Sequence, residues 1–179
     1  MHKQKLKKGD VYTVALTQGK GLIQCVNVGS ATELDIIRVI PGIYYEIDID
    51  TLPDVVRQKE LFFTQVPIEY AVTDGLISFV GNFRIPKGSK APRYYRDRHT
   101  DRREFLGWHI VDSRSLKRRF VKALTPKEQT LSPWGTISLP LLVGSIENAW
   151  TPTNWVDNTP EFQMPSHVEE ESKKPQMNN

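Results

Sequence analysis

The sequence predicts a mainly β fold of the α+β class, either a small, strongly bent sheet or an SH3-like, partly open barrel with one or two C-terminal helices. Apolar residues between positions 10 and 124 fall in short, β-branched runs separated by turn residues. After residue 138 the apolar spacing becomes helical. The length of 179 residues suffices for one hydrophobic core. We therefore expect one β-rich domain over residues 1–158 and a disordered polar tail over residues 159–179.

Residues 10–40 are expected to form the first three strands. β-Branched runs on either side of Gln18-Gly19 predict a hairpin. Residues 34–40 predict a third strand, which Pro41-Gly42 closes. Cys25 is the only cysteine, so no disulfide can form within the chain, and its apolar neighbours predict a buried strand thiol.

Residues 43–50 alternate between apolar and acidic side chains. This alternation predicts a half-buried fourth strand, with Ile43, Tyr45, Ile47 and Ile49 facing inward. The outward face of that strand would be acidic. It would carry Glu46, Asp48 and Asp50.

The rest of the β region is expected to hold two more strand pairs, followed by the helices. Residues 61–72 and 76–83 flank a turn signal, and residues 106–112 and 118–124 form the other pair. Two helix starts follow. Thr125, Pro126 and Glu128 have the spacing of a capping box with proline in the first turn, and Ser138 precedes a run of apolar residues at helical spacing over residues 138–150.

Export and membrane signals are not expected. The basic N-terminal segment is not followed by an apolar run of the length that a secretion signal needs. The longest apolar runs are also far shorter than a membrane span. We expect a soluble cytoplasmic protein that has no membrane partner.

The charge is distributed unevenly along the chain. The formal net charge is +3, but residues 33–70 contain eight acids and three bases, whereas residues 84–122 contain thirteen bases and four acids. Such asymmetry is typical of proteins that bind a charged partner. The alternative is that the two halves neutralise each other within the fold.

The densest basic stretch is "PRYYRDRHTDRRE", residues 92–104. Arginine and tyrosine are favoured anchors in protein interfaces, and the same residue types could pair phosphates and stack on bases. The three interleaved acids would repel phosphate, which favours a protein partner over nucleic acid; a solvated loop stays open as a third interpretation. The candidate partner-binding residues here are Arg93, Tyr94, Tyr95, Arg96, Arg98, Arg102 and Arg103.

Catalytic and metal-binding motifs are incomplete in this sequence. Asp48 and Asp50 have the two-residue spacing of the aspartates in haloacid dehalogenase-like phosphatases, but Thr51 replaces the glycine of that loop, and the chain lacks the strand–helix alternation of that fold. The four histidines lack zinc-site spacing. We expect no enzymatic activity, no catalytic residues, no cofactor and no metal.

Several segments, in order, resemble the immunity protein 26 family of bacterial polymorphic toxin systems. They are "KKGDVYTVAL" with "GKGLIQCV", the middle segment "ELFFTQVPIEYAVTDGLISFVGNFRIP", "PRYYRDRH" and "LTPKEQ". The resemblance covers about residues 5–150 and lies in order and spacing. The chain departs from the family pattern in its arginine-rich segment, in Gln129 where an acid is expected, and in its tail.

This resemblance implies a mainly β protein that binds and neutralises a cognate toxin by occlusion. The toxin could be a nuclease, in which case the acidic face at Glu46, Asp48 and Asp50 would occupy its basic cleft. An acidic toxin would instead contact the arginine–tyrosine segment, which we favour slightly. The alternative function is a small-barrel nucleic-acid-binding protein that uses residues 84–122. The oligomeric state stays open.

Overall fold

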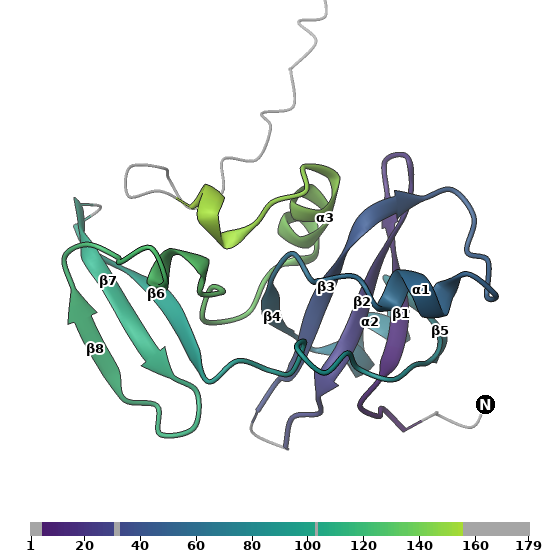
Figure 1. Ribbon diagram of the computed structural model, residues 1–179, viewed down its shortest axis with the longest axis horizontal. Coiled ribbons are helices and arrows are strands. Elements are labelled where there is room, and N and C mark those ends of the chain that lie inside the picture. The colour runs from purple at the N-terminus through teal and green to yellow at the C-terminus, as the bar shows by residue number, and fades with distance from the viewer. Residues whose placement is uncertain (1–4, 31–32, 103, 156–179) are drawn as a thin grey trace, which may run out of the picture.

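Two antiparallel β-sheets lie side by side in the computed structural model, which describes residues 5–30, 33–102 and 104–155 (Figure 1). The five-stranded sheet has the order β4-β3-β2-β1-β5. Its strands are β1 (Asp10–Leu16), β2 (Gly19–Asn27), β3 (Asp35–Tyr44), β4 (Phe63–Val66) and β5 (Ile77–Asn82). The three-stranded sheet consists of β6 (Tyr94–Asp101), β7 (Glu104–Asp112) and β8 (Arg118–Val121).

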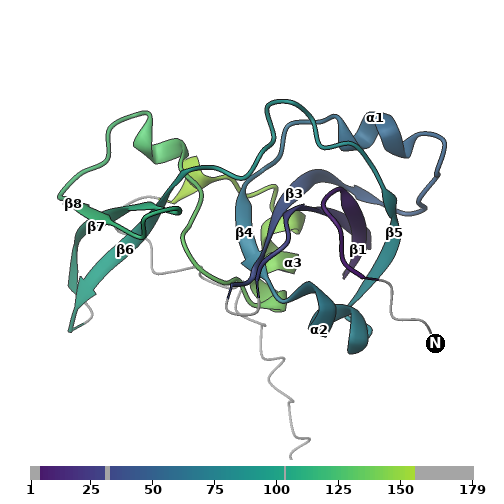
Figure 2. The same cartoon turned by 90° about the horizontal axis from the view of Figure 1, so that it is seen from below.

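Helices cover both faces of the five-stranded sheet. They are α1 (Leu52–Val56), α2 (Ile68–Thr73) and α3 (Leu139–Glu147), with two single-turn 3₁₀ helices, η1 (Glu128–Thr130) and η2 (Pro152–Asn154). Figure 2 shows α1 on one side of the curved sheet and α2 on the other. Leu142 and Ile146 of α3 and Ile68 of α2 enter the larger core, whereas Leu52 and Val56 of α1 pack on the opposite face.

The mainly β, α+β prediction is confirmed, and so are most of its strands. The β1–β2 hairpin turns after Leu16, where the left-handed φ of +99° at Gly19 favours glycine. Cys25 is fully buried in β2, as expected. The described strands form two open sheets instead of the partly open barrel.

The predicted strand over residues 43–50 is wrong. β3 passes through Pro41-Gly42 and ends at Tyr44, whose partner Lys20 lies near the start of β2. Because β2 begins at Gly19, residues 45–50 pair with no strand in the described part of the chain. The Asp48 carboxylate instead accepts the Asp50 amide (2.9 Å) in a turn that leads into α1.

Part of the apolar run over residues 61–72 is also helical instead of extended. β4 ends at Val66, and α2 begins after Pro67. Ile68 and Ala71, three residues apart, share the buried side of this helix, and the Asp35 carboxylate accepts the Ile68 amide (3.2 Å). Burial of this short helical face therefore favours a helix at residues 68–73. The run of apolar residues in the sequence looks like a strand and does not reveal this.

Both predicted helix starts near the C-terminus are found. α3 begins after Ser138 as expected. At η1, Glu128 accepts hydrogen bonds from the Thr125 amide (2.9 Å) and hydroxyl (2.7 Å), and Thr125 Oγ1 accepts the Glu128 amide (3.3 Å). The capping box therefore forms, but the helix ends after one turn because Leu131 is extended.

Residues 132–137 connect the two sheets through backbone hydrogen bonds. The backbone amide of Arg96 in β6 donates to the Ser132 carbonyl (3.0 Å), and the Arg96 carbonyl accepts the Trp134 amide (2.7 Å). In β4, the backbone amide of Gln65 donates to the Gly135 carbonyl, and the Gln65 carbonyl accepts the Ile137 amide (both 3.3 Å). The segment thus pairs first with one sheet and then with the other, which fixes the β6–β8 sheet beside β4.

Two expectations concern the membrane and the tail. No helix in residues 5–30, 33–102 and 104–155 is long and apolar enough to cross a membrane. The tail expected over residues 159–179 lies outside the described residues.

Candidate functional surfaces

The arginine–tyrosine stretch forms β6 and the turn into β7, so it is not a loop. Two of its candidate contact residues, Tyr95 and Arg96, are buried, with 2% and 0% of their surface exposed. Tyr95 packs against Val26 and Phe63 between the two sheets. Strand pleating therefore directs neighbouring candidates to different surroundings, and neither buried residue can reach a partner.

Arg96 holds the C-terminal segment of the described chain against the three-stranded sheet. Its guanidinium donates to the backbone carbonyls of Pro152 and Trp155. It also lies near the indole rings of Trp108 (4.8 Å) and Trp155 (5.0 Å), with cation–π geometry to each. Trp108 and Trp155 meet edge to face with a centroid distance of 4.8 Å.

The other candidates of this stretch differ in exposure. Arg93 is exposed and pairs with Asp112, and Arg98 is half-buried over the Phe105 ring (5.1 Å). Tyr94 is 43% exposed, and Arg102 is exposed at the turn with a left-handed φ of +45°. Arg103 lies outside the described residues.

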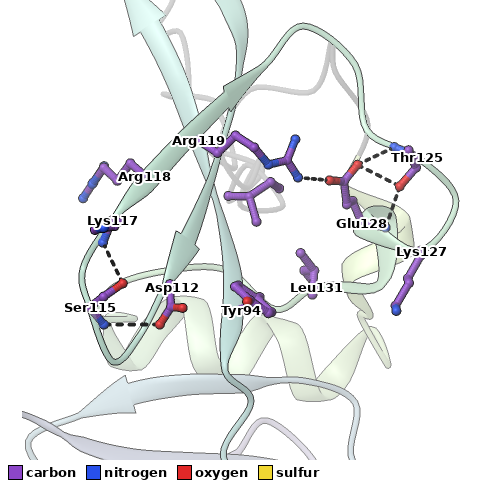
Figure 3. A pocket seen from close by; sticks show the side chains of 11 residues that line it. Tyr94, Asp112, Ser115, Lys117, Arg118, Arg119, Thr125, Lys127, Glu128 and Leu131 are labelled. Atoms are coloured by element: carbon purple, nitrogen blue, oxygen red, sulfur yellow. Dashed lines mark hydrogen bonds and ion pairs between the residues drawn. The ribbon is translucent and has the colours of Figure 1, made fainter.

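A pocket of about 650 Å³ opens between the three-stranded sheet and the η1 segment (Figure 3). We call it the basic pocket. Its apolar lining comes from Tyr94, Ile110 and Leu131. Its charged lining consists of Lys117, Arg118, Arg119, Lys127, Asp112 and Glu128, with Ser115 and Thr125 beside them.

Most of the charges around the basic pocket neutralise one another. Arg119 pairs with Glu128 across the opening (Figure 3). Arg118 of β8 pairs with Asp97 of β6 (2.7 Å), across the central strand β7. Hydrogen bonds from the Thr125 amide and hydroxyl, together with Arg119, hold the pKa of Glu128 below its ordinary value. Lys117 and Lys127 form no ion pair within the part of the chain that the structure describes.

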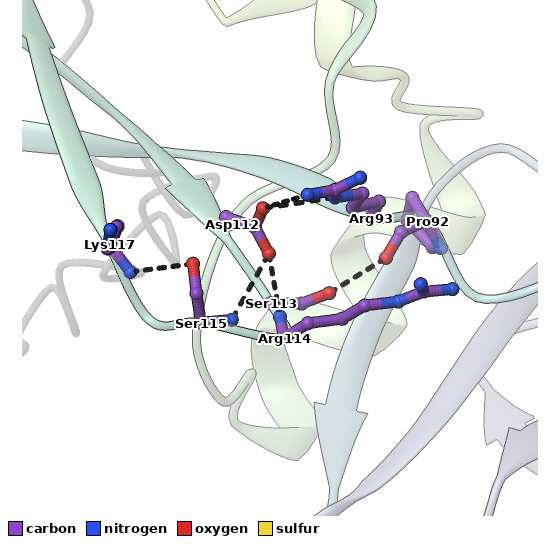
Figure 4. A network of polar contacts seen from close by, with 7 residues as sticks. All are labelled: Pro92, Arg93, Asp112, Ser113, Arg114, Ser115 and Lys117. Carbon is purple, nitrogen blue, oxygen red and sulfur yellow. Dashed lines mark hydrogen bonds and ion pairs between the residues drawn. The ribbon is translucent and has the colours of Figure 1, made fainter.

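Asp112 organises the β7–β8 turn at the edge of this pocket (Figure 4). Its Oδ1 accepts the amides of Arg114 (2.9 Å) and Ser115 (3.2 Å), and its Oδ2 accepts Arg93 Nε (3.0 Å). The turn amides first, and Arg93 after them, lower the pKa of this carboxyl. Asp112 is therefore committed to shaping the turn.

The acidic candidates lie where the chain passes from the end of β3 toward α1, and we call residues 43–50 the acidic loop. Glu46, Asp48 and Asp50 are all exposed, and none forms an ion pair with another described residue. Large apolar side chains accompany them. Exposed fractions are 77% for Tyr45, 55% for Ile49 and 40% for Ile43.

Hydrogen bonds near both ends fix the position of the acidic loop. Arg38 is fully buried in β3, where it donates to Gln24 Oε1 (2.7 Å), to Gln58 O (3.0 Å) and to Val56 O. These bonds hold the end of α1 against the sheet. At the other end, the Tyr44 hydroxyl donates to Pro41 O (2.7 Å). The exposed side chains of the loop therefore project from a fixed base.

The two charged regions lie far apart. In Figure 1, where the long axis of the molecule is horizontal, the loop between β3 and α1 is at one end and the β6–β8 sheet at the other. They do not face each other, so they do not neutralise each other within the fold. Each is therefore a separate surface of the molecule.

Metal-ligand clusters and reactive side chains bear on the expected absence of a metal site in the described residues. No group of three or more His, Cys, Asp or Glu side chains in residues 5–30, 33–102 and 104–155 could hold a metal ion. His99 and His109 meet edge to face (4.7 Å) beside Phe120. Burial raises the pKa of the Cys25 thiol to about 12, so this cysteine is a poor nucleophile.

Comparison of the chain with known protein families, curated proteins and solved structures finds no match. The acidic loop and the basic pocket are therefore the features from which a function can be proposed. The sequence predicted the acidic residues, although on a strand, but not the basic pocket, because the pocket forms only where the segment after β8 folds back over the β6–β8 sheet. The local signals were the basic residues at positions 117–119 and the capping box at Thr125 and Glu128, which the sequence does not place together.

Proposed function

We propose that this protein binds one partner protein and inhibits it by occlusion, as an immunity protein does with its cognate toxin. The observation that carries the proposal is the acidic loop, where Tyr45 is 77% exposed beside three carboxylates that lack ion pairs within the described chain. Exposed apolar side chains among free charges are typical of a binding surface. The resemblance to the immunity protein 26 family supports the same role.

The chemistry of the acidic loop suits a basic partner. Carboxylates that are not already paired within the protein attract lysines and arginines over a long range and speed association. Tyr45 and Ile49 would then supply the contact area that slows dissociation. A nuclease toxin has a basic cleft that binds phosphates, and the acidic loop would fill that cleft in their place.

The basic end ranks second as the contact surface. Tyr95 and Arg96 are buried, and Arg93, Arg118 and Arg119 already pair with carboxylates. Those ion pairs also weaken the alternative of nucleic-acid binding through residues 84–122. A nucleic-acid-binding protein would bind oligonucleotides with an affinity that falls steeply with salt.

Co-expression tests the proposal. The chain would be expressed in bacteria with a toxin domain encoded beside its gene, and cell survival would be measured. The variant E46K/D48K/D50K should lose rescue and bind the toxin at least about tenfold more weakly, since it reverses the attracting charges. The matched control E33K/E69K/D74K changes the net charge equally at exposed sites outside both candidate surfaces and should rescue fully.

Other outcomes would relocate or reject the site. Full rescue by the loop variant together with loss of rescue in R93E/R98E/R102E would move the contact to β6. Arg96 is omitted from that variant because reversing a buried charge would unfold the protein. Salt-sensitive oligonucleotide binding without toxin binding would replace the proposal with the nucleic-acid alternative.

A further inference from the structure

We propose that the acidic segment at residues 168–171 docks in the basic pocket of the same molecule. The segment reads Val-Glu-Glu-Glu and lies outside the described residues. The proposal concerns the end of the molecule opposite the acidic loop. It does not depend on the proposed function.

The basic pocket offers charge and apolar surface together. Lys117 and Lys127 form no ion pair with another described residue, so their ammonium groups are open to an anion. Arg119 makes one ion pair with Glu128, and a guanidinium has five donors, so it can bind a second carboxylate. Ile110 and Leu131 line the space below these cations. The pocket therefore suits a short acidic peptide with one apolar side chain.

The segment at residues 168–171 has the complementary chemistry. Three consecutive glutamates match the cations, and the preceding Val168 matches the apolar lining. Residues 156–179 as a whole contain five acids and two lysines, so the chain beyond Trp155 is acidic where the pocket is basic. Charge complementarity thus selects this segment as the occupant.

The described chain ends beside the pocket. Trp155 packs on Trp108 of β7, and Ile110 lies two residues along the same strand, about 7 Å away and on the same face. η2 also contacts η1, which carries Glu128 of the pocket wall. From Trp155 to Glu169 the chain can extend about 45 Å, far more than the distance required. Tethering at such close range gives an effective concentration in the millimolar range.

Docking would cover the basic pocket with the protein's own chain. The acidic loop at the other end would stay open to partners. A ligand of the basic pocket would have to displace the segment, which would weaken the binding of other acidic peptides there.

A spin label in the tail tests this docking on the full chain. Ser172→Cys provides the labelling site, because Cys25 is fully buried and its thiol pKa is raised to about 12. The backbone amide signals of Ile110, Lys127 and Leu131 should be broadened and lost in the labelled protein at low salt. The amides of Val11 and Ile40 in the five-stranded sheet should keep full intensity.

Charge variants separate docking from chance proximity. E169Q/E170Q/E171Q should restore the pocket signals, and 1 M salt should do the same because the Debye length falls to about 3 Å. The matched control K173Q/K174Q removes adjacent charges of the other sign and should leave the broadening in place. On the pocket side, K117E/K127E should also restore the signals.

Four results would overturn the proposal. They are undiminished pocket signals in the labelled protein, equal broadening of both sheets, broadening that survives in E169Q/E170Q/E171Q, and broadening that arises only between molecules. The last is detected by mixing spin-labelled protein with isotope-labelled, spin-free protein. It would assign the segment to the pocket of a second copy.

Discussion

Arg96 stabilises the fold at a position where the sequence suggests a surface contact. Its guanidinium is fully buried, lies near two indole rings and donates to two backbone carbonyls of the η2 segment. Hydrogen bonds that involve a charged group are stronger than neutral ones, and a buried charge is tolerated only when it is well bonded. The residue therefore connects β6 to the C-terminal end of the described chain.

Arg96→Met should lower the free energy of unfolding by at least about 2 kcal/mol, because the carbonyl and cation–π contacts are lost together. Urea denaturation measures the loss. The fluorescence of Trp108 and Trp155 should shift to the red as the η2 segment detaches. Arg114→Met at an exposed position is the control and should change stability by no more than about 0.5 kcal/mol. Equal stability of the two variants would contradict the anchoring role.

His109 should make stability depend on pH near neutrality. Burial first, and then His99 and Arg118, lower its pKa, while Asp97 opposes the shift. His109 therefore binds its proton more tightly in the unfolded chain than in the folded protein. Its neutral form contributes fully to stability above a pH of about 6.5, and this contribution is lost as the pH falls from there toward the pKa of the folded state.

Urea denaturation of the wild type and His109→Phe at pH 5.5 and 7.5 tests this expectation. Phenylalanine can pack with His99 and Phe120 but does not titrate. The wild type should lose more stability than the variant on acidification, and the two should behave alike between pH 7.5 and 8.5. An identical acid response of both proteins would show that His109 titrates as it does in the unfolded chain.

At the scale of elements, residues 132–137 determine how the two sheets are arranged. This segment has no regular secondary structure of its own, yet it pairs with β6 at Arg96 and with β4 at Gln65. Ser132 adds a side-chain bond, because its Oγ accepts the buried amide of Phe63 (3.0 Å). Tyr95 and Trp134 then pack edge to face (5.3 Å) at this junction.

Ser132→Ala should lower the free energy of unfolding by about 1–3 kcal/mol, since it leaves the Phe63 amide buried without its acceptor. The Phe63 amide should also exchange its hydrogen faster. Ser115→Ala is the matched control, because Ser115 Oγ accepts only a long, exposed bond from Lys117 (3.5 Å). If both substitutions have the same small effect, the Ser132 bond does not hold the junction.

At the scale of the whole molecule, the single-domain prediction for residues 1–158 can be tested by cooperativity. The two sheets share the residue 132–137 segment and the packing of Tyr95 against Val26 and Phe63. Thermal unfolding followed by calorimetry should therefore show one transition whose calorimetric and van't Hoff enthalpies agree. Two separated transitions would indicate that each sheet is its own domain.

The local pattern of the sequence determined the elements whose partners are close in the chain. The β1–β2 hairpin, the β7–β8 pair, the capping box at Thr125 and the start of α3 all follow from turn residues and caps that act within a few positions. The burial of Cys25 followed from its apolar neighbours in the same way.

Only the tertiary structure decided what depends on distant partners. Residues 43–50 alternate like a strand, but β2 begins too late to pair with them, so their acids and tyrosine became an exposed loop. Tyr95 and Arg96 look like surface anchors, but the segment at residues 132–137 and Trp155 cover them. The basic pocket exists because η1, which follows β8 closely in the chain, folds back over the β6–β8 sheet and brings Leu131 to the same cavity as Tyr94. Local chemistry acts between neighbours, whereas exposure and pairing depend on which segments the fold brings together.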